Sequence, residues 1–287
     1  MYSNNINAAL SRKNFDILSS LACNKNFSGN LDELEALGLV ENGKITNHGL
    51  AALEPYRAKR AIFIAAGFGS RLVPITLNTP KPLVRVHGKR IIDGLIDACL
   101  AAGIEEIYIV RGYLAEQFDQ LLYKYPTIKF IENPAYNEAN NISSSMAARF
   151  MLSNSYVLES DLLIHNPEII TPYHYNSDFL AIKKARTDDW CFTVDENNII
   201  TDEKIGGFDC WQMVGISYWD NRDGAKLSND IKEVYEQPGG KERYWEQVPL
   251  IYCRDKYRVS IRECFDGDIT EIDTFRELKA LDKIYDV

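Results

Sequence analysis

An apolar segment that ends in two glycines constrains the fold of this chain most strongly. Residues 61–66 carry no polar side chain, whereas a strand with one face in solvent would alternate polar and apolar residues. Such a short run is typical of a parallel strand that helices cover on both faces. Gly67 and Gly69 follow, and glycine lets the backbone turn sharply and approach a ligand closely. The segment therefore predicts the first strand of a sheet, with a binding loop at its carboxyl end.

Two cationic side chains follow this loop. Arg71 offers a forked donor that suits phosphate oxygens, and Lys81 lies between two prolines that restrict the backbone on either side. Backbone N–H groups in such a loop form a concavity that binds anions. A tight turn with solvated cations is the alternative, because Gly-x-Gly alone is weak evidence and no Walker sequence occurs. The combination favours a phosphate-binding loop.

Strand-like and helix-like segments alternate beyond residue 60, which predicts an α/β, doubly wound sheet. In the first half of this region, the sequence predicts strands at 106–110, 128–132 and 156–158, and helices at 91–102, 116–125 and from 140. In the second half of this region, the sequence predicts strands at 179–184, 190–194, 199–201 and 213–218, and helices at 230–236 and 274–284. We expect one domain over 58–287, with a mixed but mostly parallel sheet and an acceptor-binding insertion at about 180–255. Strand carboxyl ends line the ligand crevice in such sheets, which places the Gly67 loop, Gly112 and Asp161 on one rim.

Residues 1–57 predict a separate, small winged-helix-like module. The predicted elements are, in order, a helix over 13–22, a second helix capped by Asn30, a hairpin around Asn42-Gly43 and a last helix from His48. Five Lys or Arg against six Asp or Glu leave this segment with a charge of −1. DNA binding is therefore not expected, and we favour a packing, dimerisation or regulatory role, which includes a homodimer.

Composition excludes several classes of protein. The 287 residues carry a net charge of −9, which argues against a general nucleic-acid binder. Six cysteines stand far apart without a Cys-x-x-Cys pair, which favours free thiols in a reducing cytosol. No stretch has the length of an apolar membrane span and no signal peptide is visible, so we expect no membrane partner and a cytoplasmic location.

Two aspartates are candidate ligands for Mg²⁺, a cofactor that would offset the charge of phosphate groups bound at this loop. Asp161 comes directly after a buried strand, and Asp273 occurs in a late Glu-Ile-Asp sequence. Mg²⁺ prefers carboxylate oxygens and takes one or two of them from a protein. For Asp273 a helix start is the alternative, because Thr274 and Glu277 form a capping-box pattern.

The four tryptophans all fall in the second half, several of them beside acidic residues. Aromatic faces recognise a quaternary ammonium, and neighbouring negative charge adds to the attraction. We therefore interpret Trp190 and Trp245, with Asp189, Tyr244 and Glu246 beside them in the sequence, as a candidate cation cage. Core packing is the alternative, and it is favoured for the other two tryptophans, Trp211 and Trp219.

The chain also carries a long, gapped pattern. The sequence from 65 to 72, then Pro74, Thr76 and 79–83, resembles the signature loop of nucleotidyltransferases that activate sugar phosphates and small alcohol phosphates. From 61 to about 281 the chain is similar to bacterial choline-phosphate cytidylyltransferases. The further matching pieces are 110–118, 140–143, 154–157 with Asp161, Asp189-Trp190, Tyr244-Trp245 and 271–273. The N-terminal module departs from the pattern, since the shortest relatives lack it.

This resemblance implies roles for individual residues. The nucleotide-binding residues would be Ala66, Gly67, Gly69, Ser70, Arg71, Lys81, Gly112, Tyr113, Asn141 and Ser143. The catalytic residues would be Arg71, Lys81, Asp161 and Asp273, with Asp161 and Asp273 as metal ligands. The acceptor-binding residues would be Asp189, Trp190, Tyr244, Trp245, Glu246 and Glu271.

The implied reaction joins CTP and phosphocholine to give CDP-choline and pyrophosphate, by in-line attack of the acceptor phosphate on the α-phosphorus. No general base is required, because a phosphate monoester is largely ionised at neutral pH, with a second pKa of about 6. Two alternatives remain open. One is another small phosphate acceptor, such as a sugar 1-phosphate or a phosphorylated amide, and the other is a nucleotide-sensing, DNA-binding regulator.

Overall fold

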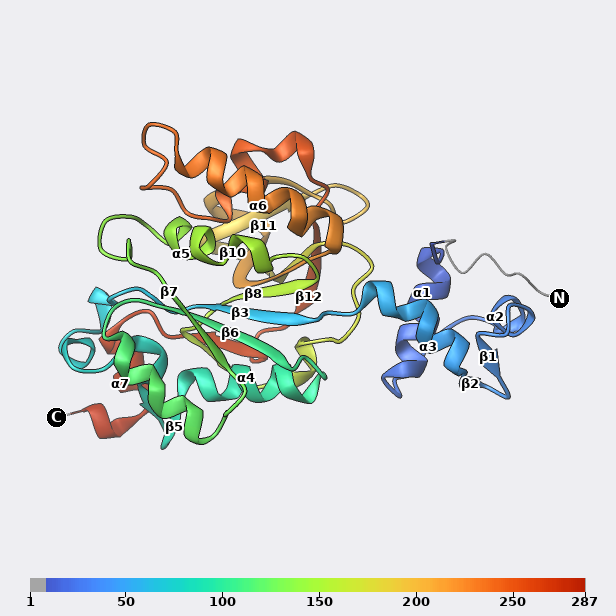
Figure 1. The fold of residues 1–287 in the computed structure, drawn as a ribbon, viewed down its shortest axis with the longest axis horizontal. Coiled ribbons are helices and arrows are strands. Elements are labelled where there is room, and N and C mark those ends of the chain that lie inside the picture. The colour runs from blue at the N-terminus through green and yellow to red at the C-terminus, as the bar shows by residue number, and fades with distance from the viewer. Residues whose placement is uncertain (1–8, 287) are drawn as a thin grey trace. The chain divides into compact units, whose positions relative to one another are not determined.

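The computed structural model of this chain describes residues 9–286, which form two compact units (Figure 1). One unit ends at Arg57 and includes Tyr173–Tyr175. The other comprises Ala58–Pro172 and the residues from Asn176 onward. Within residues 9–286, no helix is both long enough and apolar enough to cross a membrane. All six cysteines are free thiols.

The N-terminal unit has a small core of its own. Its elements are α1 (Arg12–Ala22), α2 (Asp32–Ala36), β1 (Val40–Glu41), β2 (Lys44–Ile45) and α3 (Asn47–Leu53). The two strands form the predicted hairpin, and Asn42 and Gly43 in its turn have φ values of 50° and 73°. Phe15, Leu18 and Leu53 lie in the core, against which Tyr175 packs. The winged-helix interpretation of this unit stays a prediction.

One detail of this unit differs from the prediction. Asn30 does not cap the second helix, because α2 begins at Asp32 after Leu31 and has no side-chain cap. Asn30 instead donates from Nδ2 to Oδ2 of Asp32, at 3.0 Å. The side chain therefore contacts the first carboxylate of the helix rather than a free backbone N–H group.

The larger unit is built on a seven-stranded sheet in the order β12-β10-β11-β8-β3-β6-β7. Its strands are β3 (Arg60–Ile64), β6 (Glu106–Arg111), β7 (Lys129–Glu132), β8 (Ser155–Glu159), β10 (Asp178–Val194), β11 (Ile200–Trp219) and β12 (Ser260–Cys264). Every neighbouring pair is parallel except the two pairs that contain β11. The sheet is therefore mixed and mostly parallel, as the alternation of strands and helices predicts.

Helices cover both faces of this sheet, which explains the uninterrupted apolar character of its first strand. Figure 1 shows α4 (Ile91–Ala101) on one face, and α5 (Ile142–Ala148) and α6 (Asn221–Tyr235) on the other. Phe63 of β3 packs in the core cluster that contains the α4 side chains, and Ile62 packs in the cluster of α5 and α6. Neither face of β3 meets water, so neither selects polar residues.

Small elements extend the unit at the rim of the sheet. They are the pairs β4 (Arg85–Val86) with β5 (Lys89–Arg90) and β9 (Leu162–Ile164) with β13 (Ile269–Glu271), and the helix α7 (Phe275–Leu281). Thr274 and Glu277 form the predicted capping box at the start of α7. This helix ends at Leu281, before the predicted boundary.

Two predicted helices differ from the observed ones. The segment Ala115–Tyr123 is a 3-10 helix rather than an α-helix. Helix α6 begins at Asn221, well before residue 230, because the side chain of Asp220 caps it by accepting from the N–H of Asp223 at 2.7 Å. The first turns of α6 are rich in polar residues, so the spacing of apolar residues in the sequence indicates only the second half of this helix.

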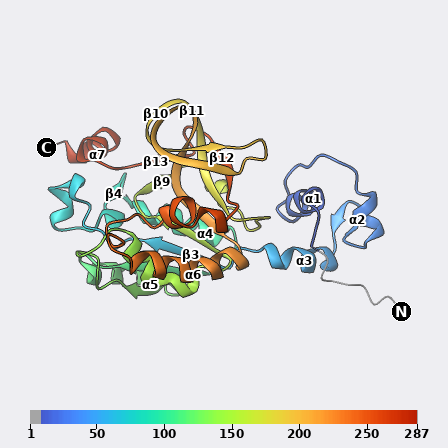
Figure 2. The same cartoon turned by 90° about the horizontal axis from the view of Figure 1, so that it is seen from above.

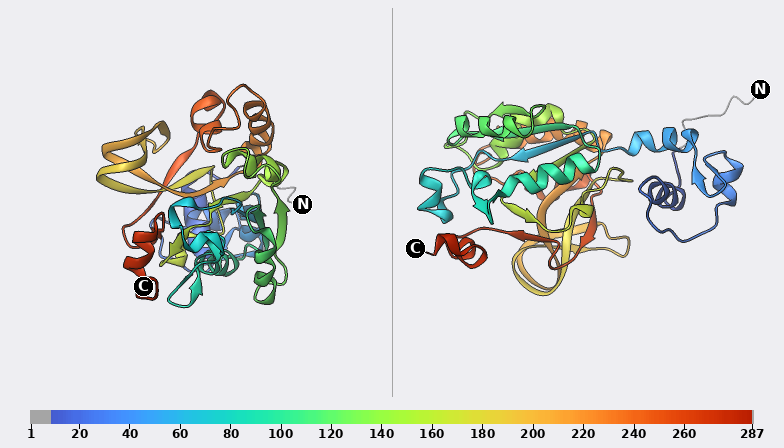
Figure 3. Two further views of the ribbon diagram at one scale, coloured as in Figure 1. Left: turned by 90° about the vertical axis from the view of Figure 1, so that its left-hand side faces the viewer. Right: turned by 90° about the horizontal axis from the view of Figure 1, so that it is seen from below.

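The strands β10 and β11 are long and irregular, and they extend beyond the sheet as a curved arm (Figures 2 and 3). Their pairing register shifts repeatedly, and Phe192 is paired with both Glu203 and Trp211. The four shorter predicted strands therefore fall within two long, irregular strands. This arm brings Asp189 and Trp190 back toward the sheet.

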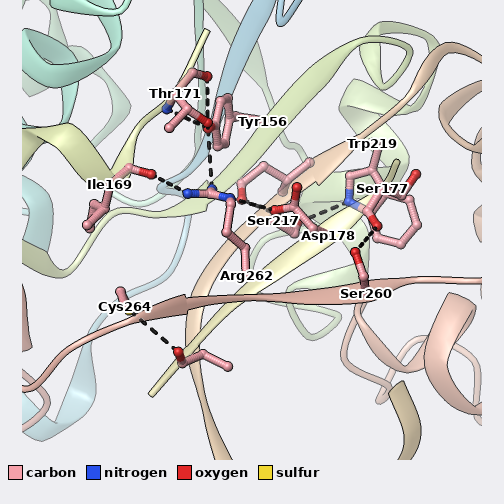
Figure 4. A network of polar contacts seen from close by, with 12 residues as sticks. Tyr156, Ile169, Thr171, Ser177, Asp178, Ser217, Trp219, Ser260, Arg262 and Cys264 are labelled. Atoms are coloured by element: carbon pink, nitrogen blue, oxygen red, sulfur yellow. Dashed lines mark hydrogen bonds and ion pairs between the residues drawn. The ribbon is translucent and has the colours of Figure 1, made fainter. Parts of the chain in front are cut away.

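A buried ion pair anchors the edge strand β12 (Figure 4). Arg262 donates from Nε to Oδ1 of Asp178 at 3.1 Å and from Nη2 to the hydroxyl of Tyr156 at 3.3 Å, and it also donates to the carbonyl of Ile169. Because these partners belong to β8, β10 and the segment after β9, the network fixes β12 in place.

Candidate active site

A cavity of about 460 Å³ opens at the carboxyl ends of the central strands. Segments from all parts of the larger unit line it. They are the end of β3 and the loop after it (Ile64, Ala66, Gly67, Arg71), the segment from β7 into α5 (Asn133, Tyr136, Ala139, Asn140, Asn141, Ser143, Ser144), the end of β8 and the two residues after it (Glu159, Ser160, Asp161), the arm (Asp189, Trp190, Met213, Gly215), and Tyr244, Glu246, Glu271 and Asp273. This is the rim that parallel α/β topology predicts for a ligand.

The two glycines of the loop after β3 serve different purposes. Gly69 has a φ of 67°, and a Cβ atom there would lie 3.2 Å from Cβ of Lys81 and 3.3 Å from Cγ2 of Thr76. Gly67 has no atom within 4 Å of such a Cβ and lines the cavity. Gly69 is therefore required by the fold, whereas Gly67 keeps space free beside the cavity.

The side chains that hold this loop lie behind it. Thr76 donates from Oγ1 to the carbonyl of Gly69 at 3.0 Å, and the hydroxyl of Tyr113 donates to the carbonyl of Thr76 at 2.9 Å. The ring of Phe68 packs edge-on against Tyr113, with centroids 4.7 Å apart. Tyr113 therefore supports the loop and does not line the cavity, unlike the nucleotide contact that the resemblance implies.

Lys81 joins the two predicted aspartates. Its Nζ lies 2.7 Å from Oδ2 of Asp161 and 3.2 Å from Oδ1 of Asp273, and Arg71 Nη2 lies 2.8 Å from the same Asp273 oxygen. Burial alone would lower the pKa of Lys81, but the two carboxylates outweigh it and raise that pKa. The aspartates thus face each other across one ammonium group, and the exposed Arg71 guanidinium borders the cavity.

Three carboxylates form a second group at the same place. Oxygens of Glu159, Asp161 and Glu271 all lie within 4.8 Å of one another. Burial, followed by the negative charge of Asp161, raises the pKa of Glu159, and the same two causes raise the pKa of Glu271 to about 8. Oδ1 of Asp161 is buried and has no hydrogen-bond partner among residues 9–286.

This acidic group fits a magnesium ion. Its donors are carboxylate oxygens, which hard cations prefer, and a bound cation would satisfy the unpartnered Asp161 oxygen and offset the mutual repulsion. The group differs from the predicted pair, because Glu159 and Glu271 accompany Asp161 while Asp273 contacts Lys81 and Arg71. Glu159 was missed, although its place at the carboxyl end of a strand indicates the rim.

The segment from β7 into α5 supplies a polar wall. Asn133 donates from Nδ2 to Oγ of Ser143 at 2.9 Å and to Oγ of Ser144 at 3.0 Å. Asn141 accepts at Oδ1 from the N–H of Trp245 at 2.9 Å. Asn133, Tyr136 and Ser144 are lining residues that sequence reasoning missed. Asn133 directly follows β7, so the strand-end rule identifies it.

The predicted nucleotide-binding residues divide into those that line the cavity and those that do not. Ala66, Gly67, Arg71, Asn141 and Ser143 line it. Gly69, Ser70, Lys81, Gly112 and Tyr113 are not among its lining residues. These residues belong to the loop and the strand end that shape the wall.

The acceptor-side predictions separate into two groups. Trp190 and Tyr244 meet edge to face with ring centroids 5.9 Å apart, and both line the cavity together with Asp189 and Glu246. Burial raises the pKa of Glu246 to about 7. Trp245 does not belong to this group.

The predicted cage role of Trp245 is wrong. Only 3% of this side chain is exposed. Its ring lies 6.1 Å from that of Phe179 and 6.0 Å from that of Trp219, in the core beneath the arm. Adjacent residues point in different directions, so the Tyr244 ring borders the cavity while the next ring fills the core. Trp219 is fully buried, as predicted, and Trp211 is partly buried against the same core.

Comparison with known proteins agrees with this architecture. A family model described as nucleotidyl transferase matches residues 60–198. A 2-aminoethylphosphonate cytidylyltransferase of Lancefieldella rimae is 36% identical over 78% of this chain and 92% of its own length. A choline-phosphate cytidylyltransferase of Streptococcus pneumoniae is 31% identical over 78% of this chain and 97% of its own.

Solved structures give the same result. A CTP:phosphocholine cytidylyltransferase from Streptococcus pneumoniae matches with a TM-score of 0.71 and 29% identity, over 79% of this chain and 99% of that one. An inositol-1-phosphate CTP transferase from T. maritima shares the fold, with a TM-score of 0.63 and 17% identity over 80% and 95% of the two chains. This chain therefore belongs to the nucleotidyl transferase family, and its relatives include cytidylyltransferases.

Proposed function

We propose that this chain transfers the cytidylyl group of CTP to a small acceptor that bears a phosphate or phosphonate and an ammonium group, and that Mg²⁺ is its cofactor. The observation that carries the proposal is the meeting of Arg71, Lys81, Asp161 and Asp273 beside a glycine loop at one cavity. The relatives that use CTP support the choice of nucleotide.

The charges of this site suit an exchange of partners when substrates bind. Without a ligand, Lys81 and Arg71 pair with the aspartates. A triphosphate offers these cations its own oxygens, which frees the carboxylates of Asp161 and Asp273 for a metal ion. Glu159 and Glu271 complete the set of donors. Bound Mg²⁺ would supply charge neutralisation at the phosphates.

Catalysis then consists of alignment and charge stabilisation. The loop around Gly67 and the Arg71 guanidinium hold the triphosphate, and Lys81 stabilises the negative charge that develops on pyrophosphate as it leaves. The acceptor phosphate attacks the α-phosphorus directly, because it is largely ionised at neutral pH. No side chain has to remove a proton from it.

The acceptor side suits a cation. Trp190 and Tyr244 offer aromatic faces, and Asp189 and Glu246 offer negative charge. Phosphocholine is the acceptor that the sequence resemblance favours, because aromatic faces attract a quaternary ammonium. A sugar 1-phosphate would place hydroxyl groups against two aromatic rings, so we rank it lower.

The position of Trp245 favours 2-aminoethylphosphonate as the second candidate. With Trp245 in the core, the acceptor side that we propose has the rings of Trp190 and Tyr244 beside the carboxylates of Asp189 and Glu246, rather than a closed aromatic box. A primary ammonium donates hydrogen bonds to carboxylates, whereas a trimethylammonium cannot. A relative that is 36% identical is named for this acceptor.

Pyrophosphate release tests the function and the acceptor together. CTP and Mg²⁺ are combined with phosphocholine, 2-aminoethylphosphonate or glucose 1-phosphate, and kcat/KM is measured for each acceptor. We expect turnover with at least one of the two ammonium acceptors and a loss of about 100-fold or more in Asp161→Asn, since metal-held charge stabilisation is removed. Asp188→Asn is the matched control, because this exposed carboxylate pairs with Arg186 outside the cavity. Equal activity of wild type and Asp161→Asn would refute the mechanism.

We also propose that residues 180–255 form the acceptor-binding insertion, that the protein works in the cytoplasm, and that residues 1–57 form a winged-helix-like module with a packing, dimerising or regulatory role. The alternative of a DNA-binding regulator predicts salt-sensitive, sequence-selective binding by the full chain. The charge of −1 over 1–57 disfavours it. Titration of the intact protein with duplex DNA distinguishes these roles.

A further inference from the structure

Tyr136 is pressed against the end of β6. A Cβ atom on Gly112 would lie 2.6 Å from Cβ and Cγ of Tyr136 and 2.8 Å from its Cδ1. Gly112 does not have a positive φ, so the backbone itself does not require glycine there. The glycine instead allows close packing of the tyrosine, and Tyr136 lines the cavity.

Ser144 presents a polar group in the same cavity. Its side-chain oxygen accepts from Asn133 Nδ2 at 3.0 Å, which fixes the hydroxyl in place. Among residues 9–286 no acceptor receives the hydroxyl hydrogen of Ser144, and the residue lines the cavity. The hydroxyl of Ser143, by contrast, donates to the carbonyl of Asn140 at 2.8 Å. Of these two serines, Ser144 is therefore the one whose hydroxyl hydrogen is available to a ligand.

The wall around these two residues is rigid. Asn133, Ser143 and Ser144 are 3%, 4% and 3% exposed. Both Nδ2 hydrogens of Asn133 are used, and its Oδ1 accepts from the N–H of Ala135 at 3.0 Å. Moving this wall outward would break buried hydrogen bonds and leave polar groups buried without partners, which is unfavourable.

We propose that Tyr136 and Ser144 select the nucleotide base by size, admitting a pyrimidine and excluding a purine. The Tyr136 ring provides the apolar wall against which the base lies, and the Ser144 hydroxyl donates a hydrogen bond to an acceptor on the base, such as O2 of cytosine. A purine has a second fused ring, for which neither the packed tyrosine nor the buried network behind it can make room. This inference rests on the proposed function only in that a nucleotide occupies the cavity.

The first experiment removes the wall. Dissociation constants of CTP and ATP are measured by calorimetry with Mg²⁺, for the wild type and for Tyr136→Ala. We expect the wild type to prefer CTP, and the variant to lose CTP affinity about tenfold or more, the range of base–aromatic stacking. The ratio of the ATP and CTP dissociation constants should fall by about tenfold, a usual size for discrimination by pocket volume. Tyr123→Ala is the matched control, because Tyr123 is 98% exposed.

The second experiment removes the hydroxyl. Ser144→Ala should weaken CTP binding by about three- to tenfold, as expected for one neutral hydrogen bond. Ser145→Ala is the control, since the hydroxyl of Ser145 donates to the carbonyl of Ile142 and does not line the cavity. Gly112→Ala should also weaken CTP binding, because the added methyl group displaces Tyr136.

The outcomes separate this inference from the proposed function. A wild type that binds ATP as tightly as CTP, or a Tyr136→Ala variant with an unchanged ratio, overturns the size-selection inference even if cytidylyl transfer occurs. A wild type that prefers CTP but transfers to none of the acceptors leaves the inference standing and refutes the proposed reaction. Circular dichroism of each variant confirms that the folded structure is retained.

Discussion

Single residues at the cavity show how similar sequence features serve different purposes. The glycines of the first loop occur as a pair in the sequence, yet only Gly69 has a left-handed backbone and side chains packed against it. Gly67 faces open space at the cavity. The reason for glycine at position 67 therefore lies outside the chain, in the ligand that approaches it.

A pair of substitutions tests this distinction. Gly67→Ala should leave the melting temperature unchanged and weaken CTP binding by about tenfold or more, because the methyl group enters the space for the ligand. Gly69→Ala should lower stability by about 1–2 kcal/mol, the cost of a left-handed alanine. Thermal unfolding and calorimetry with CTP measure both. A large loss of stability in Gly67→Ala would contradict this account.

Glu203 is a buried carboxylate that the proposed reaction does not use. It is 8% exposed, and in the part of the chain that the structure describes neither of its carboxylate oxygens has a hydrogen-bond partner. Burial, followed by the charges of Glu246 and Asp202, raises its pKa to about 8. The folded state binds the carboxyl proton of Glu203 more tightly than the unfolded state does. Burial of this side chain therefore destabilises the protein least at low pH. That advantage is lost progressively as the pH rises from the ordinary pKa of 4.5 to the raised pKa of about 8.

Glu203→Gln should therefore stabilise the protein in alkaline solution. We expect little difference at pH 4 and a gain of several kcal/mol at pH 9, since the penalty grows by about 1.4 kcal/mol for each pH unit between the ordinary and the raised pKa. Chemical unfolding at several pH values measures the difference. The exposed Glu196 supplies the control Glu196→Gln. A gain that is the same at both pH values would show that ionisation of Glu203 is not its cause.

At the scale of elements, the arm of β10 and β11 combines core packing and recognition. Trp245 and Trp219 meet edge to face in the core below it, and Trp190 meets Tyr244 at the cavity. Sequence reasoning located the aromatic residues but could not assign their sides. The pairing register shifts several times along the arm, so the usual alternation of inward and outward residues does not carry through.

Two tryptophan substitutions separate these roles. Trp245→Ala should destabilise the fold by about 3–5 kcal/mol, the cost of removing a large buried ring. Trp190→Ala should leave stability nearly unchanged and raise KM for the ammonium acceptor about tenfold, with KM for CTP unaffected. Thermal unfolding and steady-state kinetics supply the two readouts. An unchanged acceptor KM in Trp190→Ala would remove Trp190 from the acceptor site.

At the scale of the whole molecule, the two units are connected through more than one segment. Tyr175 follows the larger unit's residue Pro172 by only three positions, yet it packs in the N-terminal unit. Its ring stacks on Tyr56 with centroids 5.7 Å apart, and its hydroxyl donates to the carbonyl of Leu10 at 2.9 Å. The N-terminal unit therefore depends on a segment far away in the sequence.

Tyr175→Ala should weaken the N-terminal unit selectively. We expect faster proteolysis within residues 9–57, because the small core loses a large ring, and nearly unchanged cytidylyl transfer, because the cavity is built from the larger unit alone. Limited proteolysis with mass spectrometry and the pyrophosphate assay measure both. Tyr252→Ala is the control, since Tyr252 lies outside this core and is 45% exposed. Loss of transfer in Tyr175→Ala would show that the two units are functionally coupled.

The sequence by itself determined what local chemistry dictates. The apolar run of β3, the hairpin turn at Asn42 and the capping box at Thr274 follow from preferences of a few adjacent residues, as does the glycine loop with its two cations. The alternation of segments also predicted the mixed sheet and its binding rim. Local signals suffice here because each depends on backbone conformation or on burial of both strand faces.

Only the tertiary structure decided which distant side chains meet. Carboxylate oxygens of Asp161, Glu159 and Glu271 lie close together, whereas Asp273 pairs with two cations. The side chain of Trp245 lies in the core. Tyr136 and Ser144 join the cavity through a glycine contact and an asparagine that carry no motif. These placements depend on strand register and loop path, which are set by packing across the whole sheet rather than by neighbours in the chain.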